Sequence, residues 1–133
     1  MTCVLVVEDD PHNALLFRKL LERRGGCSVI LTESAEEVVD HVRGGAIDLV
    51  IMDVSLANTG WNGVPINGIE LCRILKSDPA TASVPVVLAT AHAMRGDAEA
   101  FASQSGADGY VSKPILDHAE FILQVQSIAR KAA

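Results

Sequence analysis

The chain has 133 residues, of which 49% are hydrophobic, and its 11 Lys and Arg against 17 Asp and Glu give a net charge of −6. This length predicts one domain over residues 1–133 with a sizeable core. The charge disfavours direct nucleic-acid binding, which depends on clustered Lys and Arg, and no apolar run approaches the roughly 20 residues that span a bilayer.

Short apolar runs alternate along the chain with segments of helical periodicity. The runs predict five strands, at residues 3–7, 29–31, 49–52, 86–89 and 110–111. Three of them are apolar at nearly every position, a pattern typical of strands that are covered on both faces of a parallel sheet.

The segments between the strands carry apolar residues three and four positions apart, as amphipathic helices do. Asp10-Pro11 predicts the start of the first helix, and glycine pairs at 25–26 and 44–45 predict the ends of the first two. Five successive strand–helix units imply an α/β fold, a doubly wound five-stranded parallel sheet with helices on both faces. In such sheets the working site lies at the carboxyl ends of the strands.

Charged and polar residues follow four of the five predicted strands. Glu8 and Asp9 follow the first, Asp53 the third, Thr90 the fourth and Lys113 the fifth. Clustered carboxylates repel one another and need a cation, and Mg²⁺ suits a few carboxylate oxygens together with retained water. The same groups suit phosphoryl transfer to an Asp nucleophile, which depends on positioning and charge neutralisation.

Several residues near these strand ends also have a purely structural explanation. Asp10 is better explained as a helix cap than as a metal ligand, because Pro11 follows it. Taken alone, Asp53 is as well explained as an ordinary loop residue. Solvated loop charges are the alternative for Glu8 and Asp9, but two adjacent acids directly after a buried strand favour a site. The joint arrangement at one edge of the predicted sheet favours a site.

The motifs that contain these residues resemble the receiver domain of bacterial two-component response regulators. They are VLVVEDDP at 4–11, DLVIMD at 48–53, PVVLATA at 85–91 and GADGYVSKP at 106–114. The resemblance covers essentially the whole chain and implies the flavodoxin-like, CheY-like fold. The chain is most similar to stand-alone receivers, since no output domain follows.

The resemblance implies that Asp53 accepts a phosphoryl group from a phosphohistidine of a sensor kinase or phosphotransfer protein. Glu8 and Asp9 match the acidic pair that binds Mg²⁺, with Asp53 and the backbone carbonyl of Ser55 as further ligands. The family more often has Asp at the position of Glu8. The implied protein is a signalling switch that catalyses only its own phosphorylation and dephosphorylation, and is not otherwise an enzyme.

Three further roles follow from the resemblance alone. Thr90 and Tyr110 match the switch pair that responds to phosphorylation, and Lys113 matches the family's lysine, followed by a cis bond to Pro114. By itself, Tyr110 is better explained as a packed, half-buried aromatic residue, so its switch role follows from the resemblance only.

The loop after Asp53 departs from the family. Its helix-starting glycine corresponds to Gly68, fifteen residues after Asp53, so that residues 57–67 form an enlarged loop. This loop contains Trp61, the only tryptophan of the chain. Trp61 either packs down to hold the loop or is an exposed anchor for a partner.

Two other functions compete with the phosphorylation switch. A degenerate receiver would act as a constitutive interaction domain, and an aspartate-based phosphatase would need a second Asp where Ser55 stands. A P-loop NTPase is excluded because no G-x-x-x-x-G-K-[ST] motif occurs. The lack of a signal-peptide pattern and the three widely spaced cysteines favour a cytoplasmic protein with reduced thiols. The sequence does not name the downstream partner.

Overall fold

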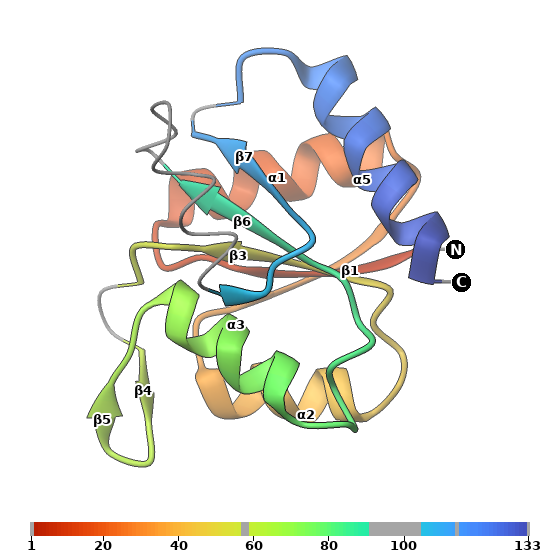
Figure 1. The fold of residues 1–133 in the computed structure, drawn as a ribbon. Coiled ribbons are helices and arrows are strands. Elements are labelled where there is room, and N and C mark those ends of the chain that lie inside the picture. The colour runs from red at the N-terminus through yellow and green to blue at the C-terminus, as the bar shows by residue number, and fades with distance from the viewer. Residues whose placement is uncertain (1, 57–58, 91–104, 114, 133) are drawn as a thin grey trace.

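The computed structural model describes residues 2–56, 59–90, 105–113 and 115–132 (Figure 1). The elements follow in the order β1 (Cys3–Val7), α1 (Pro11–Arg23), β2 (Ser28–Thr32), α2 (Ala35–Arg43), β3 (Leu49–Asp53), β4 (Gly60–Trp61), β5 (Val64–Pro65), α3 (Gly68–Ser77), β6 (Val86–Thr90), β7 (Gly109–Ser112) and α5 (His118–Ala132). The helix expected after the fourth strand, and the predicted cis bond to Pro114, lie outside the described residues.

Five strands form one parallel sheet in the order β2-β1-β3-β6-β7. Helices α1 and α5 cover one face of this sheet, and α2 and α3 cover the other (Figure 1). The predicted doubly wound α/β fold is therefore confirmed. Strands β2 and β7 extend beyond the predicted apolar runs, because backbone pairing continues through polar residues such as Ser28 and Ser112.

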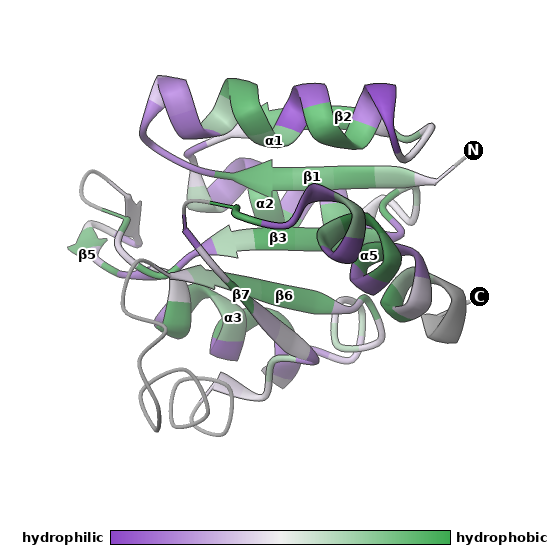
Figure 2. Cartoon of the chain, turned by 90° about the horizontal axis from the view of Figure 1, so that it is seen from above, coloured by the Kyte–Doolittle hydropathy of each residue, from purple (hydrophilic) through white to green (hydrophobic). Residues whose placement is uncertain are grey.

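The core lies on both sides of the sheet, which explains why the central strands are apolar at every position. In β1, Leu5 and Val7 pack into the cluster beneath α2 and α3, whereas Val4 and Val6 pack into the cluster beneath α1 and α5. Figure 2 shows β1, β3 and β6 as hydrophobic bands between these helical layers. Successive side chains of a strand point to opposite faces, so a strand covered on both sides is apolar throughout.

Local signals determine where two helices begin. Asp10 caps α1, accepting a hydrogen bond of 2.9 Å from the backbone N–H of His12, and Pro11 occupies the first turn. At α3 the Asn67 side chain accepts from the Glu70 N–H, and the Glu70 carboxylate accepts from the Asn67 N–H. Both helices therefore start at the carboxyl edge of the sheet with their first N–H groups satisfied.

The opposite, amino edge of the sheet contains a lysine-centred network. The Lys76 ammonium donates to the Asp108 carboxylate at 2.8 Å and to the carbonyls of Ala82 and Val84 at 3.2 and 3.0 Å. Asp108 also accepts from the Val86 N–H at 2.8 Å. The network joins the end of α3 to the starts of β6 and β7.

The three cysteines are free thiols. Across the described part of the chain, none of the helices combines the length and the apolar character that crossing a membrane requires.

Candidate functional site

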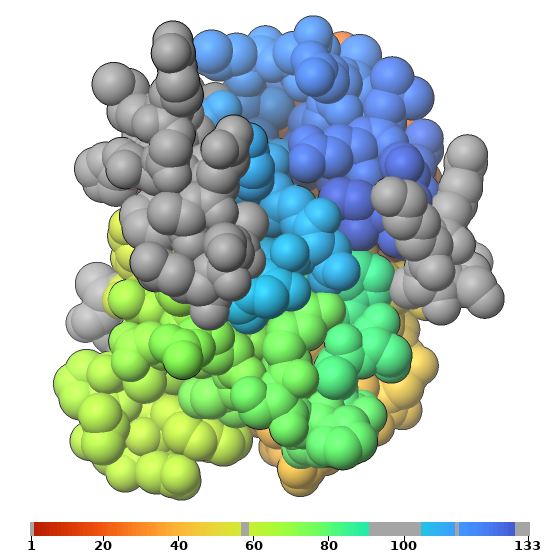
Figure 3. Space-filling model, viewed as in Figure 1, coloured from red at the N-terminus to blue at the C-terminus, as the bar shows by residue number. Residues whose placement is uncertain are grey.

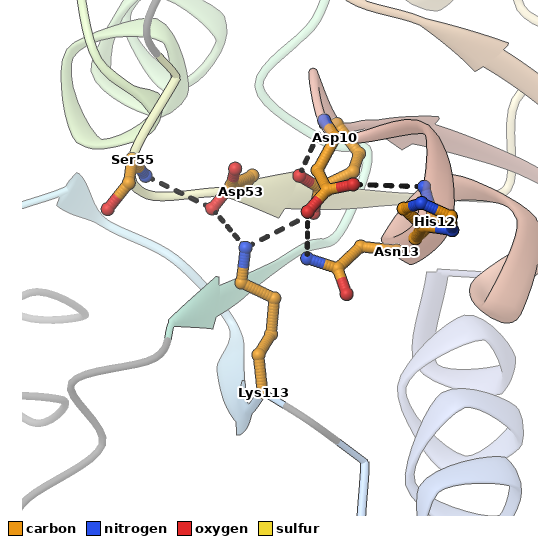
Figure 4. A network of polar contacts seen from close by, with 7 residues as sticks. Asp10, His12, Asn13, Asp53, Ser55 and Lys113 are labelled. Atoms are coloured by element: carbon orange, nitrogen blue, oxygen red, sulfur yellow. Dashed lines mark hydrogen bonds and ion pairs between the residues drawn. The ribbon is translucent and has the colours of Figure 1, made fainter.

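Asp53, Glu8 and Lys113 meet at the carboxyl edge of the sheet, although they come from three distant parts of the chain. The Lys113 ammonium lies 2.8 Å from Asp53 Oδ1 and 3.2 Å from Glu8 Oε2. Figure 4 shows Lys113 reaching from the end of β7 toward Asp53 at the end of β3. The strand register explains the meeting, because the carboxyl ends of β1, β3 and β7 lie along the same edge.

The carboxylates at this edge are buried and held by backbone donors. The side chains of Glu8 and Asp53 are only 1% and 3% exposed, and that of Lys113 is 12% exposed. Asp53 Oδ1 accepts from the Ser55 N–H at 3.1 Å, and Glu8 Oε1 accepts from the Asp10 N–H at 3.2 Å. Both carboxylates are therefore oriented before any ligand arrives.

The burial and the crowding of charge shift two pKa values. Burial, and then the hydrogen bond and negative charge of Asp53, raise the pKa of Glu8 to about 7, against a smaller opposing effect of Lys113. Burial alone would lower the pKa of Lys113, but its hydrogen bond and charge interaction with Asp53, together with those with Glu8, raise it overall. The edge thus keeps a cationic lysine and still carries more negative charge than the lysine offsets.

The acidic residues at the site fit a hard divalent cation. Glu8, Asp9 and Asp53 each offer an oxygen, and these three oxygens lie within 4.8 Å of one another. Three carboxylates face one ammonium, so a bound cation would relieve their repulsion. Carboxylate oxygens in this number, with room for water, are what Mg²⁺ takes in proteins. The predicted ligands Glu8, Asp9 and Asp53 are thus brought together, while the Ser55 carbonyl as a ligand stays a prediction.

The two residues predicted as a switch pair lie on neighbouring strands. Thr90 ends β6 and is 1% exposed, and its carbonyl accepts from the Lys113 N–H at 2.9 Å. Tyr110 lies on β7 and is 37% exposed. Thr90 follows directly after Ala89, the residue that pairs with Asp53 across the sheet. Thr90 therefore lies beside the acidic site, whereas Tyr110 lies toward the surface.

The enlarged loop after Asp53 contains a small antiparallel hairpin, β4 and β5, which was not predicted from the sequence. Its turn is Asn62-Gly63, with φ of 53° and 81°. Two successive residues with positive φ are typical of the tight turn that closes a two-residue hairpin, and Asn-Gly is the preferred pair there. The Asn-Gly pair between Trp61 and Val64 was the signal that could have predicted this hairpin.

Trp61 is partly buried and packs against the core cluster beneath α2 and α3. The exposed part of the hairpin is its turn and second strand, where Val64 is 59% exposed. Figure 3 shows the hairpin as a yellow-green protrusion next to α3. This packing agrees with Trp61 as a holder of the loop, and its role as a partner contact stays a prediction.

Gly68 allows α3 to begin directly against the backbone of Asp53. A side-chain carbon at this position would overlap the Asp53 carbonyl, and the Gly68 N–H donates to the Val54 carbonyl at 3.0 Å. A glycine is needed wherever two backbones approach this closely. The start of α3 therefore holds the segment that follows the acidic strand end.

The comparisons with known proteins agree with the fold. The model of the response regulator receiver domain matches residues 4–126. The polar-differentiation response regulator DivK of Brucella ovis is 38% identical over 112 residues, which cover 84% of each chain. The DivK of Brucella anthropi matches with the same identity and coverage.

Two solved structures are similar over nearly their whole length. A putative response regulator from Chloroflexus aurantiacus has a TM-score of 0.81 at 27% identity, covering 97% of this chain and 98% of its own. The receiver domain of the sensor histidine kinase PA1611 from Pseudomonas aeruginosa has a TM-score of 0.79 at 26% identity, with the same coverage. That structure has a magnesium ion coordinated in its active-site cleft.

Proposed function

Since the chain belongs to the family of response regulator receiver domains, we propose that it works as a phosphorylation switch in two-component signalling, with Asp53 as the acceptor. The phosphoryl donor is a phosphohistidine on a sensor kinase or phosphotransfer protein, and the phosphorylated form acts on a downstream protein. Residues 1–133 act as one receiver domain with a hairpin insertion. The chain has no other substrate and catalyses only its own phosphorylation and dephosphorylation.

The observation that carries this proposal is the contact of Lys113 with two buried carboxylates. The Lys113 ammonium lies 2.8 Å from Asp53 and 3.2 Å from Glu8, at the carboxyl ends of the strands, where ligands of such sheets bind. A lysine with a purely structural role is already neutralised by one carboxylate, whereas Lys113 contacts two. Lys113 instead lies where it can follow negative charge from Asp53 to an incoming phosphoryl group.

In the transfer, an oxygen of Asp53 forms a bond to phosphorus while the bond between phosphorus and the donor's imidazole nitrogen breaks. The electron pair of that bond stays on the leaving imidazole. The Ser55 N–H and Lys113 both donate to Asp53 Oδ1 and orient the carboxylate. Lys113 also offsets the charge that develops on the phosphoryl oxygens, which is the main requirement of phosphoryl transfer.

Glu8, Asp9 and Asp53, with the backbone carbonyl of Ser55, would hold Mg²⁺. When bound, this ion neutralises negative charge on the phosphoryl oxygens and screens the carboxylates from one another. The fit of three carboxylate oxygens within 4.8 Å of one another supports this assignment.

Thr90 and Tyr110 are proposed to carry the switch. The Thr90 hydroxyl would donate to the new phosphoryl group, which adds about two negative charges and strong acceptors. The partly exposed Tyr110 would then change its packing at the surface around β7. Such a response needs two discrete arrangements of that surface.

The direct test is incubation of the protein with a small phosphodonor and Mg²⁺, followed by intact mass measurement. We expect one phosphoryl adduct, formed slowly or not at all when the metal is chelated. Asp53→Asn should take up none, and Asp9→Asn should slow the reaction without abolishing the acceptor. A wild-type protein that stays unmodified would overturn the proposal.

A further inference from the structure

The inserted hairpin is fastened to the body of the protein by a buried threonine. Thr59, just before β4, is 3% exposed, and its hydroxyl donates to the backbone carbonyl of Glu33 at 2.8 Å. Its own carbonyl accepts from the Ile66 N–H at 3.0 Å, which closes the base of the hairpin. Because a buried hydroxyl or carbonyl without a partner is costly, this bond holds residue 59 against Glu33.

Glu33 belongs to the loop that supports one of the acidic residues. The preceding residue, Thr32, accepts the backbone N–H of Glu8 through its carbonyl at 3.2 Å. The Thr32 hydroxyl accepts from the Ser34 N–H at 3.1 Å, and Ser34 caps α2. The segment that Thr59 binds is therefore ordered on its own account and sits next to the backbone of Glu8.

The other end of the loop after Asp53 is fixed as well. Val54 donates to the Ala89 carbonyl at 3.0 Å and accepts from the Gly68 N–H at 3.0 Å. Ser55, whose N–H holds Asp53 Oδ1, follows immediately. The segment after Asp53 is thus tied at Val54 and again at Thr59.

We propose that Thr59 is a positioning residue for the acidic site, and that the hairpin insertion braces the loop after Asp53 against the loop that supports Glu8. One loop follows Asp53, and the other follows Thr32, which accepts the backbone N–H of Glu8. Because Asp53 and Glu8 would hold a common cation, a fixed distance between the two loops favours metal binding. This inference rests on the proposed function, and it assigns the insertion a role inside the site itself. Trp61, in the same hairpin, packs against the core cluster beneath α2 and α3 and helps to hold the hairpin in place.

The test compares two valine substitutions at buried threonines. Thr59→Val keeps the size of the side chain and removes the hydrogen bond to Glu33. Thr81 lies beyond the end of α3, is 1% exposed, and donates its hydroxyl to the Leu75 carbonyl at 2.6 Å. Thr81→Val therefore also removes a buried hydrogen bond without changing the size of the side chain. Thr59→Ser keeps the hydroxyl. For each variant, Mg²⁺ affinity is measured by calorimetry and stability by chemical unfolding without metal.

We expect Thr59→Val to weaken Mg²⁺ binding about threefold to tenfold. This is less than the loss of affinity that follows when a residue hydrogen-bonded to a metal-ligating side chain is replaced. Thr81→Val should leave the affinity unchanged, although both valines lower stability. Thr59→Ser should restore most of the affinity. Equal affinities for the two valine variants would overturn the inference, because Thr59 would then be purely structural.

A second measurement uses the unaltered protein. If the brace is coupled to the site, adding Mg²⁺ should slow amide hydrogen exchange more at Ile66, whose N–H bonds to Thr59, than at Thr81, where only the general gain in stability acts. Equal slowing at Ile66 and Thr81 in a protein that binds Mg²⁺ and is phosphorylated would overturn the inference alone. A wild-type protein that neither binds Mg²⁺ nor takes up phosphoryl would overturn the proposed function and this inference together.

Discussion

Each edge of the sheet holds a partly buried lysine in contact with acid, and the two surroundings differ in one respect. Lys76, at the amino edge, pairs with one carboxylate, Asp108, and donates to two carbonyls. Lys113, at the carboxyl edge, contacts two carboxylates, Glu8 and Asp53, and a third acid lies close to both. The Lys76 network is balanced in charge, whereas the Lys113 network carries excess negative charge.

This difference separates a structural network from a site. At the amino edge the charges of Lys76 and Asp108 cancel, and Asp108 also accepts a hydrogen bond from the Val86 N–H. This balanced network holds α3, β6 and β7 together. At the carboxyl edge the uncompensated charge is relieved only by a proton or a cation. Burial, and then the hydrogen bond and charge of Asp53, raise the pKa of Glu8 accordingly. Substitutions at the two edges should therefore have different effects.

The largest expected effect comes from Lys113→Met. The change keeps most of the apolar stem and removes the ammonium beside Asp53 and the transferred group. Removing one such charge-stabilising donor costs on the order of 100-fold in rate. We expect the initial rate of phosphorylation by a small phosphodonor to fall by about that factor, measured by mass spectrometry at a temperature where the variant is folded.

The matched substitution at the other edge, Lys76→Met, is the control. The phosphorylation rate of Lys76→Met should stay within about threefold of that of wild type. Lys76 lies at the opposite end of the strands, where it pairs with Asp108 and takes no part in phosphoryl transfer. Equal losses of phosphorylation rate in Lys113→Met and Lys76→Met would contradict the distinction between a functional site at the carboxyl edge and a structural network at the amino edge.

Lys76→Met should instead lower stability. It leaves the Asp108 carboxylate and the carbonyls of Ala82 and Val84 without their shared donor. Unpaired groups of this kind cost about 2 kcal/mol when partly buried. Chemical unfolding should show that loss for Lys76→Met, with Asp108→Asn losing less because it keeps a polar group. An unchanged midpoint would show that the network contributes little to stability.

The smallest expected effect is a dependence of stability on pH without metal. Because the pKa of Glu8 is raised from 4.5 to about 7 in the folded protein, its contribution is complete below the unfolded value and is lost as pH rises through about 7. The melting temperature should therefore fall as the pH rises from 4.5 to about 7, less so in Glu8→Gln. Mg²⁺ should raise the melting temperature more at the upper end of this pH range than at the lower end. An equal rise at both ends would contradict the proposed excess of negative charge at the carboxyl edge.

The sequence predicted the sheet well because its strands are buried on both faces. Strand β1 was predicted with its observed bounds, and the acids at 8, 9 and 53 were predicted to share an edge with Lys113, which they do. That prediction needed only strand order and the fact that parallel strands end together. The roles of Thr90 and Tyr110 came from resemblance and stay predictions.

Other features could not be predicted from local patterns. Lys76 reads in sequence as an ordinary lysine on the surface of a helix, and its network appears only when α3, β6 and β7 are assembled. Thr59 donates to a carbonyl 26 residues away, which no periodicity indicates. The hairpin was missed although Asn62-Gly63 indicates it, because the strands that it joins have only two residues each.

The most direct test of the account is to locate the phosphoryl group. After reaction with a small phosphodonor and Mg²⁺, borohydride reduction converts an aspartyl phosphate to the corresponding alcohol, and peptide mass spectrometry then identifies the residue. The account predicts modification at Asp53 alone, formed slowly or not at all when Mg²⁺ is chelated. Modification at Glu8, Asp9 or a histidine, with Asp53 unaltered, would contradict it.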